Sequence, residues 1–222
     1  MCNESKNEDY LIQCKGGEEW KTCKYLGSML DTMKDIKRRK GLTINAMHTM
    51  NHIWKSSVIS ENTKLRIFAS YIQPVFLSNS ELWTTTTSIE GIINSFQRRL
   101  LRWAINIRYP RKISTETLKA RLKYQQWSEY ISTQRLRWLG HALRLPEDSP
   151  AKQALNIIDE PVTRTRGRPK LKWIDIVRNQ LKELNITWEK AKETSQHRAK
   201  WRELVVRWSK KREQNATPVA KN

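Results

Sequence analysis

Three arginines spaced by two residues are the most distinctive chemical feature of this sequence. Arg164, Arg166 and Arg168 lie in a run that ends at Pro169. In an extended chain alternate side chains point the same way, so these three guanidinium groups can face one phosphate backbone. Gly167 permits close approach of the main chain, Pro169 holds it extended, and each guanidinium binds oxygen acceptors as a fork. The run predicts a loop that binds phosphates.

The same run has two other interpretations. Arg166-Gly167-Arg168-Pro169 matches the core of an AT-hook, whose arginines lie along the floor of the DNA minor groove. The run can also be an ordinary solvated loop between two helices. The match covers four residues of a basic protein, so the more general interpretation, an arginine-rich loop on phosphates, is favoured over the AT-hook.

Basic residues and a tryptophan flank the run on both sides. The flanking residues are Arg135, Arg137, Trp138 and His141 before it, and Lys170, Lys172 and Trp173 after it. The cations are candidate phosphate ligands, although a histidine near a helix C-terminus also fits as a simple cap cation. The tryptophans can stack on bases, but packing in the core is the interpretation favoured for them.

Two further basic groups precede this region. Arg98, Arg99 and Arg102, followed by Arg108, lie largely off the apolar stripe of a helix that begins at Ser88. The other group is Lys34, Lys37, Arg38, Arg39 and Lys40. Each group predicts a face that either contacts phosphates or is solvated.

The residues expected of an enzyme are missing. There is no Asp-Asp pair to hold two metal ions and no Walker-type glycine-rich loop. His48 and His52 are one helical turn apart, but they lack a glutamate between them, and solvated histidines are the favoured interpretation. The cysteines, Cys2, Cys14 and Cys23, form neither a zinc knuckle nor a disulfide framework. We therefore expect no catalytic residue, no metal site and no cofactor in this chain.

The charge balance points to a polyanionic partner. The chain of 222 residues holds 42 Lys and Arg against 22 Asp and Glu, a net charge of +20. Residues 1–30 sum to −1, so the excess lies in the rest of the chain. Nucleic acid, RNA and/or DNA, is favoured over an anionic membrane. No apolar run approaches the roughly 20 residues of a membrane span and nothing resembles a signal peptide. We expect an intracellular protein, in the nucleus and/or cytoplasm, that is not secreted.

The apolar periodicity predicts a mainly α fold, with helical bundle(s) and a small N-terminal β-hairpin. The hairpin is expected to turn at Gly16-Gly17 and to carry Tyr25-Leu26-Gly27-Ser28 in its second strand. Pro74 is expected to kink or end the second helix. The expected helices cover about 31–55, 60–76, 88–107, 114–122, 128–145, 151–158 and 170–184, with a last one after Thr187.

An ordered series of short segments resembles a known family. The segments are Tyr25-Leu26-Gly27-Ser28, Asp35-Ile36-Lys37-Arg38-Arg39, Ile53-Trp54, Lys64-Leu65, Pro74-Val75, Glu81-Leu82-Trp83, Gln97-Arg98-Arg99-Leu100-Leu101-Arg102, Arg137-Trp138-Leu139-Gly140-His141, Gly167-Arg168-Pro169-Lys170, Trp173 and Arg198-Ala199-Lys200-Trp201-Arg202. Together they resemble the C-terminal part of the endonuclease-reverse transcriptases encoded by non-LTR (LINE-type) retrotransposons. The match covers roughly residues 20–208, and its order is more specific than any one segment.

The resemblance implies where this chain lies in such a polymerase. In that family the palm with its Ala-Asp-Asp metal site, which would bind Mg²⁺, lies upstream of the Tyr-Leu-Gly-Ser strand, and an endonuclease lies further upstream. Residues 77–81 depart from the family, which usually has Tyr-Gly before the acid. The implied domains are an end-of-palm hairpin at 1–30, a thumb-like helical region at 31–112, a basic helical nucleic-acid-binding region at 113–213 and a disordered tail at 214–222. The upstream polymerase and endonuclease regions are implied partners.

The expected function is therefore nucleic-acid binding by a fragment of an RNA-directed DNA polymerase that lacks its palm. The thumb-like helices would grip template-primer duplex, and the region after Ser114 would hold template RNA or target DNA. Three alternatives remain: an enzyme that polymerises alone or in an assembly, a domesticated protein with a binding or protein-interaction role, and a relic reading frame without a selected role.

Overall fold

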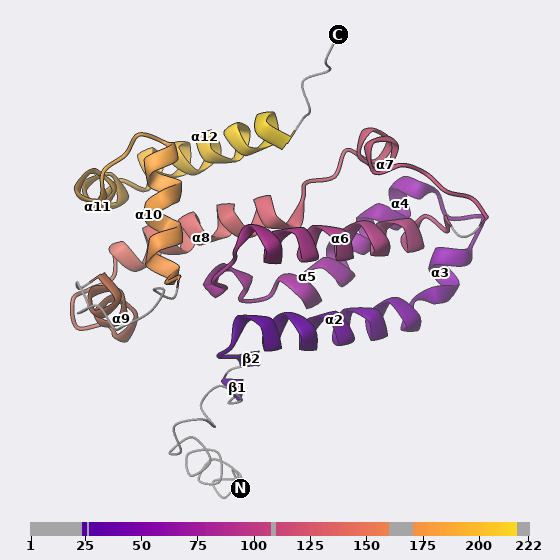
Figure 1. The fold of residues 1–222 in the computed structure, drawn as a ribbon, viewed down its shortest axis with the longest axis horizontal. Helices are drawn as coiled ribbons and strands as arrows, with labels where there is room; N and C mark the ends of the chain where they lie inside the picture. The colour runs from indigo at the N-terminus through magenta and orange to yellow at the C-terminus, as the bar shows by residue number, and fades with distance from the viewer. Residues whose placement is uncertain (1–23, 26, 108–109, 160–170, 217–222) are drawn as a thin grey trace, which may run out of the picture. The chain divides into compact units, whose positions relative to one another are not determined.

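Helices form most of this protein. The computed structural model describes residues 24–25, 27–107, 110–159 and 171–216 (Figure 1). In this described part the β-structure is one antiparallel pair of two-residue strands, β1 (Lys24–Tyr25) and β2 (Ser28–Met29). The mainly α fold class expected from the sequence is confirmed.

Two compact units make up the chain. Unit 1 contains the residues up to Asn79 together with Ser95–Arg121, and unit 2 contains Ser80–Asn94 and the residues from Leu122 on. This division differs from the expected boundary between 112 and 113, because residues 80–94 pack with the C-terminal helices while 95–121 pack with the N-terminal ones. Each unit is described separately below.

The strand pair departs from the expected hairpin in its register. Lys24 pairs with Met29 and Tyr25 with Ser28, so the turn lies within the Tyr-Leu-Gly-Ser segment, which was expected to be a single strand. Gly27 has a φ of 85°, the left-handed conformation that a glycine adopts at low cost. The expected turn at Gly16-Gly17 lies outside the described residues.

The first helical segment of unit 1 is interrupted near its end. Helix α2 (Thr32–Thr49) begins after Asp31, whose carboxylate accepts a hydrogen bond from the main-chain N–H of Lys34, and α3 (Asn51–Lys55) follows after Met50. Gly41 lies within the continuous part of α2, although a glycine weakens a helix interior. The sequence placed this region correctly as helical but as one helix.

A π-helical turn accommodates Pro74 in the next segment. Helix α4 (Glu61–Ile67) continues through a π-helix, η2 (Phe68–Ile72), into α5 (Gln73–Leu77), and Pro74 occupies the first turn of α5. A proline lacks an N–H and its ring crowds the carbonyl four residues earlier, and a wider turn relieves both problems. The helical path therefore continues past Pro74 to Leu77 as three contiguous segments.

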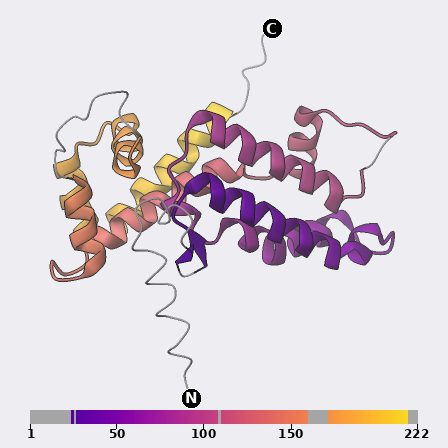
Figure 2. The same ribbon diagram turned by 60° about the horizontal axis from the view of Figure 1, so that its bottom comes forward.

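Two helices complete unit 1. Helix α6 (Thr87–Ala104) ends earlier than the expected Ile107, and α7 (Thr115–Leu122) follows. Helices α2, α5 and the second half of α6 lie alongside one another (Figures 1 and 2), and their core includes Phe76 and Phe96, whose ring centroids are 5.3 Å apart. This packing presents one side of α2 and one side of α6 to each other.

Among its described residues, unit 2 contains a short 3₁₀ segment, the start of α6 and five further helices. They are η3 (Ser80–Leu82), α8 (Trp127–Leu143), α9 (Pro150–Asp159), α10 (Trp173–Glu183), α11 (Trp188–Gln196) and α12 (Arg198–Ala216). Residues 214–216 are thus the end of α12, whereas the sequence predicted a disordered tail from 214. Residues 217–222 lie outside the described part.

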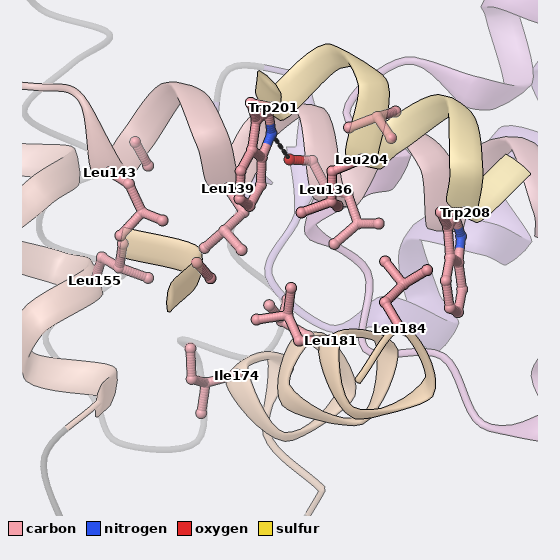
Figure 3. Packing of buried hydrophobic residues seen from close by; sticks show 14 residues of the cluster. Leu136, Leu139, Leu143, Leu155, Ile174, Leu181, Leu184, Trp201, Leu204 and Trp208 are labelled. Atoms are coloured by element: carbon pink, nitrogen blue, oxygen red, sulfur yellow. Dashed lines mark hydrogen bonds between the residues drawn. The ribbon is translucent and has the colours of Figure 1, made fainter. Parts of the chain in front are cut away.

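Helices α8 and α12 enclose the core of unit 2. Leu136, Leu139 and Trp208 are fully buried there, and Trp201 is 4% exposed (Figure 3). The indole Nε1 of Trp201 donates a hydrogen bond to the carbonyl of Leu136 at 3.0 Å. Leu181 and Leu184, from α10 and the residue after it, close the other side of this core.

Candidate nucleic-acid interface

The arginine-rich run lies outside the described residues. Arg164, Arg166, Arg168 and Lys170 therefore stay a sequence-based prediction. Lys172 follows as the residue before α10 and is exposed. The geometry below concerns the other candidate residues.

Arg135 is a buried structural residue, which corrects its assignment as a phosphate ligand. Its side chain is on the inward side of α8, and the residue is 1% exposed. It donates hydrogen bonds to the carbonyl of Trp83 (3.0 Å), to Thr85 Oγ1 (3.1 Å) and to Gln180 Oε1 (3.5 Å). Burial lowers the pKa of Arg135 to about 10, with a smaller opposing effect from Glu90. The guanidinium joins the segment before α6 to α8 and cannot reach a ligand in solution.

Arg137 and His141 lie on the outer side of the same helix. They are one turn apart and both are exposed. Trp138 and Trp173, the candidate base-stacking residues, instead pack edge to face with ring centroids 5.2 Å apart. The indole Nε1 of Trp173 also donates to the carbonyl of Glu81 at 2.8 Å. The two tryptophans are packing residues of unit 2, as favoured from the sequence.

The three α6 arginines of unit 1 differ in their surroundings. Arg99 is exposed, and it makes no hydrogen bond or ion pair with another described residue. Arg98 is half-buried and donates to Ser95 Oγ at 2.8 Å. Arg102 is half-buried as well, and its Nη2 donates to the carbonyl of Ile113 (3.3 Å) and to Thr115 Oγ1 (3.4 Å).

Two of these arginines line a cavity of about 480 Å³, which we call the Trp103 pocket. Its lining residues are His48, Asn51, Arg99, Arg102, Trp103 and Ile107. The imidazole of His48 meets the indole of Trp103 edge to face, with centroids 4.7 Å apart. Trp103 Nε1 donates to Asn51 Oδ1 at 3.4 Å. The pocket thus combines an aromatic wall with two guanidinium groups.

The electrostatic environment of this pocket is positive. Burial is the main cause that lowers the pKa of Lys40, and the nearby charge of Arg99 lowers it further. The stretches 36–60 and 91–115, which supply the pocket, contain no Asp and no Glu. An anion is the ligand that relieves such like-charge repulsion.

The third predicted basic group divides into surface and core residues. Lys34 and Lys37 are exposed, and Arg38 donates to the carbonyl of Gly27 at 2.8 Å. Arg39 is 4% exposed and forms an ion pair with Asp35 at 2.9 Å, so it is part of the core. Lys37 and His48 are eleven residues apart on α2, which is close to three full turns, so both lie on the same side of that helix.

The sequence interpretation missed the Trp103 pocket and one more cationic surface. That surface is the outward side of α12, where Arg202, Arg207 and Lys210 are exposed beside a single acid, Glu203. Arg202 and Lys210 are separated by eight residues, which is the spacing of one helix face, and this spacing was the available signal. The absence of acids from 36–60 and 91–115 was a signal for a cationic surface around the pocket, but not for the pocket itself.

Comparisons with known proteins do not assign a family. No match was found to a protein-family model, to a curated protein or to a solved structure. Within the described residues, no group of three or more His, Cys, Asp or Glu side chains is placed to hold a metal ion. No helix in the same part of the chain has the length and hydrophobicity that a membrane span requires.

Proposed function

We propose that this chain binds nucleic acid through the phosphate backbone, as the C-terminal part of a retrotransposon reverse transcriptase downstream of its palm. The observation that carries the proposal is the cationic face of unit 1, formed by α2, α3 and the second half of α6, whose stretches 36–60 and 91–115 contain no Asp and no Glu. Lys37, Lys40, Arg99 and Arg102 contribute to this face. A net charge of +20 supports the same class of partner.

Phosphate contacts account for the expected properties of this binding. Each phosphate that a Lys or Arg neutralises releases counterions, so the affinity falls steeply as salt increases. Such contacts position the protein and carry no base information. The thumb-like helices of unit 1 would hold template-primer duplex, and the helices after Ser114 would hold template RNA or target DNA.

The binding is tested by filter binding of a duplex oligonucleotide over a salt series. We expect log K to fall linearly with log salt, with a slope of about −0.9 per phosphate contact. The variant Lys37→Gln/Arg99→Gln removes two exposed cations of the unit 1 face and should flatten the slope by up to about 2. A flat dependence in the wild-type chain contradicts the proposal.

A matched control removes the same charge elsewhere. Lys182 and Lys190 are exposed, and Lys190 is already paired with Glu193 at 3.0 Å. The variant Lys182→Gln/Lys190→Gln should leave the slope within about 0.5 of wild type, because these cations lie among acids on α10 and α11. Equal effects of the two double variants would show that only the net charge matters and that unit 1 has no specific face.

The reverse-transcriptase origin has its own test. The genomic sequence upstream of the Met1 codon should encode, in frame, an Ala-Asp-Asp motif within about a hundred codons, the spacing that the family resemblance implies. An intact upstream region without this motif would reject the origin and leave the nucleic-acid binding to stand on the salt series.

A further inference from the structure

We propose that the Trp103 pocket holds an unpaired base of a single-stranded segment, with the adjacent phosphates on Arg99 and Arg102. This inference rests on the proposed function and deepens it, because it adds to the backbone contacts of unit 1 a site for an unpaired base beside the duplex. Three features of the pocket support the inference: its aromatic wall, its two arginines and its size.

The aromatic wall is held in place before any ligand arrives. Trp103 is half-buried, its ring and that of His48 meet edge to face, and its Nε1 donates to Asn51 Oδ1. These contacts come from α2 and α3, whereas Trp103 belongs to α6, so the indole is fixed between two elements. A fixed aromatic face is a stacking platform for a nucleobase, because little side-chain entropy is lost when the base binds.

The arginines are placed to hold the phosphates of that nucleotide. Arg99 is exposed and has no ion-pair or hydrogen-bond partner among the described residues. Arg102 uses only its Nη2, in two contacts of 3.3 and 3.4 Å, so most of its five N–H donors face no partner in the described part of the chain. Two guanidinium groups one turn apart can grip consecutive phosphates, or one phosphate from two sides.

The size and form of the pocket favour an unpaired base over a duplex. Its volume of about 480 Å³ lies in the range of small-ligand sites. A duplex stacks its base faces against one another, so only an unpaired or flipped base can present a face to Trp103. The pocket therefore distinguishes single-stranded from fully paired nucleic acid, which phosphate contacts alone do not.

Little base preference is expected. Asn51 is the one amide that lines the pocket, its Oδ1 accepts from Trp103, and it has a further interaction within the protein. A base edge would therefore find few groups dedicated to reading it. Stacking tolerates every base because each has a π-face.

The direct test compares two single-stranded oligonucleotides of equal length, one with bases and one abasic, at one salt concentration. Both carry the same phosphates, so any difference in Kd measures the bases. We expect the base-bearing strand to bind on the order of tenfold more tightly. Equal binding of both strands would overturn the pocket assignment while leaving intact the phosphate-binding function, which the salt series tests separately. Absence of binding to either strand would overturn both.

A variant pair assigns the difference to the pocket. Trp103→Leu should reduce the ratio of abasic to base-bearing Kd to about 1. The matched control is Trp188→Leu, which removes a half-buried tryptophan of unit 2 packed against Arg178 and Lys192. This control should keep the full ratio. An unchanged ratio in a folded Trp103→Leu protein contradicts the proposal.

A cross-linking measurement on the wild-type chain does not depend on the folding of a variant. A strand that carries 5-iodouracil is irradiated in the complex, and the adducts are mapped by mass spectrometry. Adducts on Trp103 or His48 support the assignment. Adducts confined to other residues overturn it.

Discussion

Gly140 shows how a residue that looks functional in the sequence is explained by packing. It lies in the basic segment Arg137-Trp138-Leu139-Gly140-His141, yet it is buried in α8. A Cβ atom at this position would lie 2.0 Å from Nε1 of Trp201. Two segments about 60 residues apart in the sequence therefore meet here. The absence of a side chain at Gly140 lets the indole of Trp201 lie directly on the helix.

Replacement of Gly140 by alanine should destabilise the protein. The indole cannot withdraw freely, because its Nε1 is bonded to the carbonyl of Leu136. Overpacking of this kind costs about 1–3 kcal/mol, which corresponds to a fall in Tm of roughly 3–10 °C for a chain of this size. Thermal unfolding followed by circular dichroism measures the shift.

The matched control is Gly91→Ala. Gly91 is an exposed residue inside α6, and a Cβ there would meet no atom within 4 Å. Alanine should raise stability by about 0.5–1 kcal/mol, because glycine weakens a helix interior. Equal destabilisation by both substitutions would show that the indole at Gly140 is not the cause.

The residue type alone does not show which of the basic residues are buried in the core. The basic side chain of Arg135 predicts a phosphate ligand, whereas its position in the apolar period of α8 predicts the inward side, where the structure has it. The apolar periodicity of the helix predicted the burial of this residue better than its charge did. The position of a residue in a helix fixes the direction of its side chain, whatever the residue type. What the sequence could not show is that the carbonyl of Trp83 and the side chains of Thr85 and Gln180 would accept hydrogen bonds from the two Nη atoms there, while the buried Nε has no hydrogen-bond partner among the described residues.

At the scale of elements, the sequence located the helices better than their ends. Helix α6 ends in a Schellman motif, with Ile107 N–H bonded to the carbonyl of Arg102 at 2.8 Å and Asn106 at a φ of 57°. The end of α10 repeats this arrangement, with Asn185 at a φ of 56°. Glycine is the usual residue at this position, so the two asparagines were only a weak sequence signal for the end of each helix.

Buried lysines complete two other helix ends. Lys64 donates from Nζ to the carbonyls of Trp54 and Ser56, at 2.9 and 2.7 Å, where α3 ends. Lys152 donates to the carbonyl of Leu143 at 3.0 Å, the last residue of α8. The last carbonyls of a helix have no partner within it and carry partial negative charge, so a cation satisfies both requirements.

We predict that Lys152→Met lowers stability and leaves nucleic-acid affinity unchanged. The methionine keeps the length of the side chain but removes a charge-assisted hydrogen bond, which is worth about 1.5–3 kcal/mol. Chemical denaturation gives the change in unfolding free energy. Lys190→Met, at an exposed position, should change it by less than about 0.5 kcal/mol. A loss of affinity in the folded Lys152→Met protein would show that this lysine reaches phosphate.

For the whole molecule, the net charge of +20 divides into structural and surface parts. Arg39, Lys64, Arg135 and Lys152 stabilise the folded chain from within. The exposed cations remain as candidate phosphate ligands, and the overall charge balance alone predicted that such a surface exists. The Trp103 pocket could not be predicted in the same way, because it depends on contacts between residues about 50 positions apart.

The outward side of α12 provides the test of whether unit 2 also contacts phosphates. Arg202 and Lys210 are two helical turns apart on one side, with Arg207 close by, and Glu203 offsets one of these charges. Replacing the three cations by glutamine should flatten the dependence of log K on log salt by up to about 2.7, because each phosphate contact contributes about 0.9. All three residues are exposed, and Arg207 donates one long hydrogen bond, 3.5 Å, to the carbonyl of Leu184, so the Tm should stay within about 2 °C of wild type. A slope equal to that of the wild-type chain would confine the interface to unit 1, and the cations of α12 would then serve only as a solvated surface.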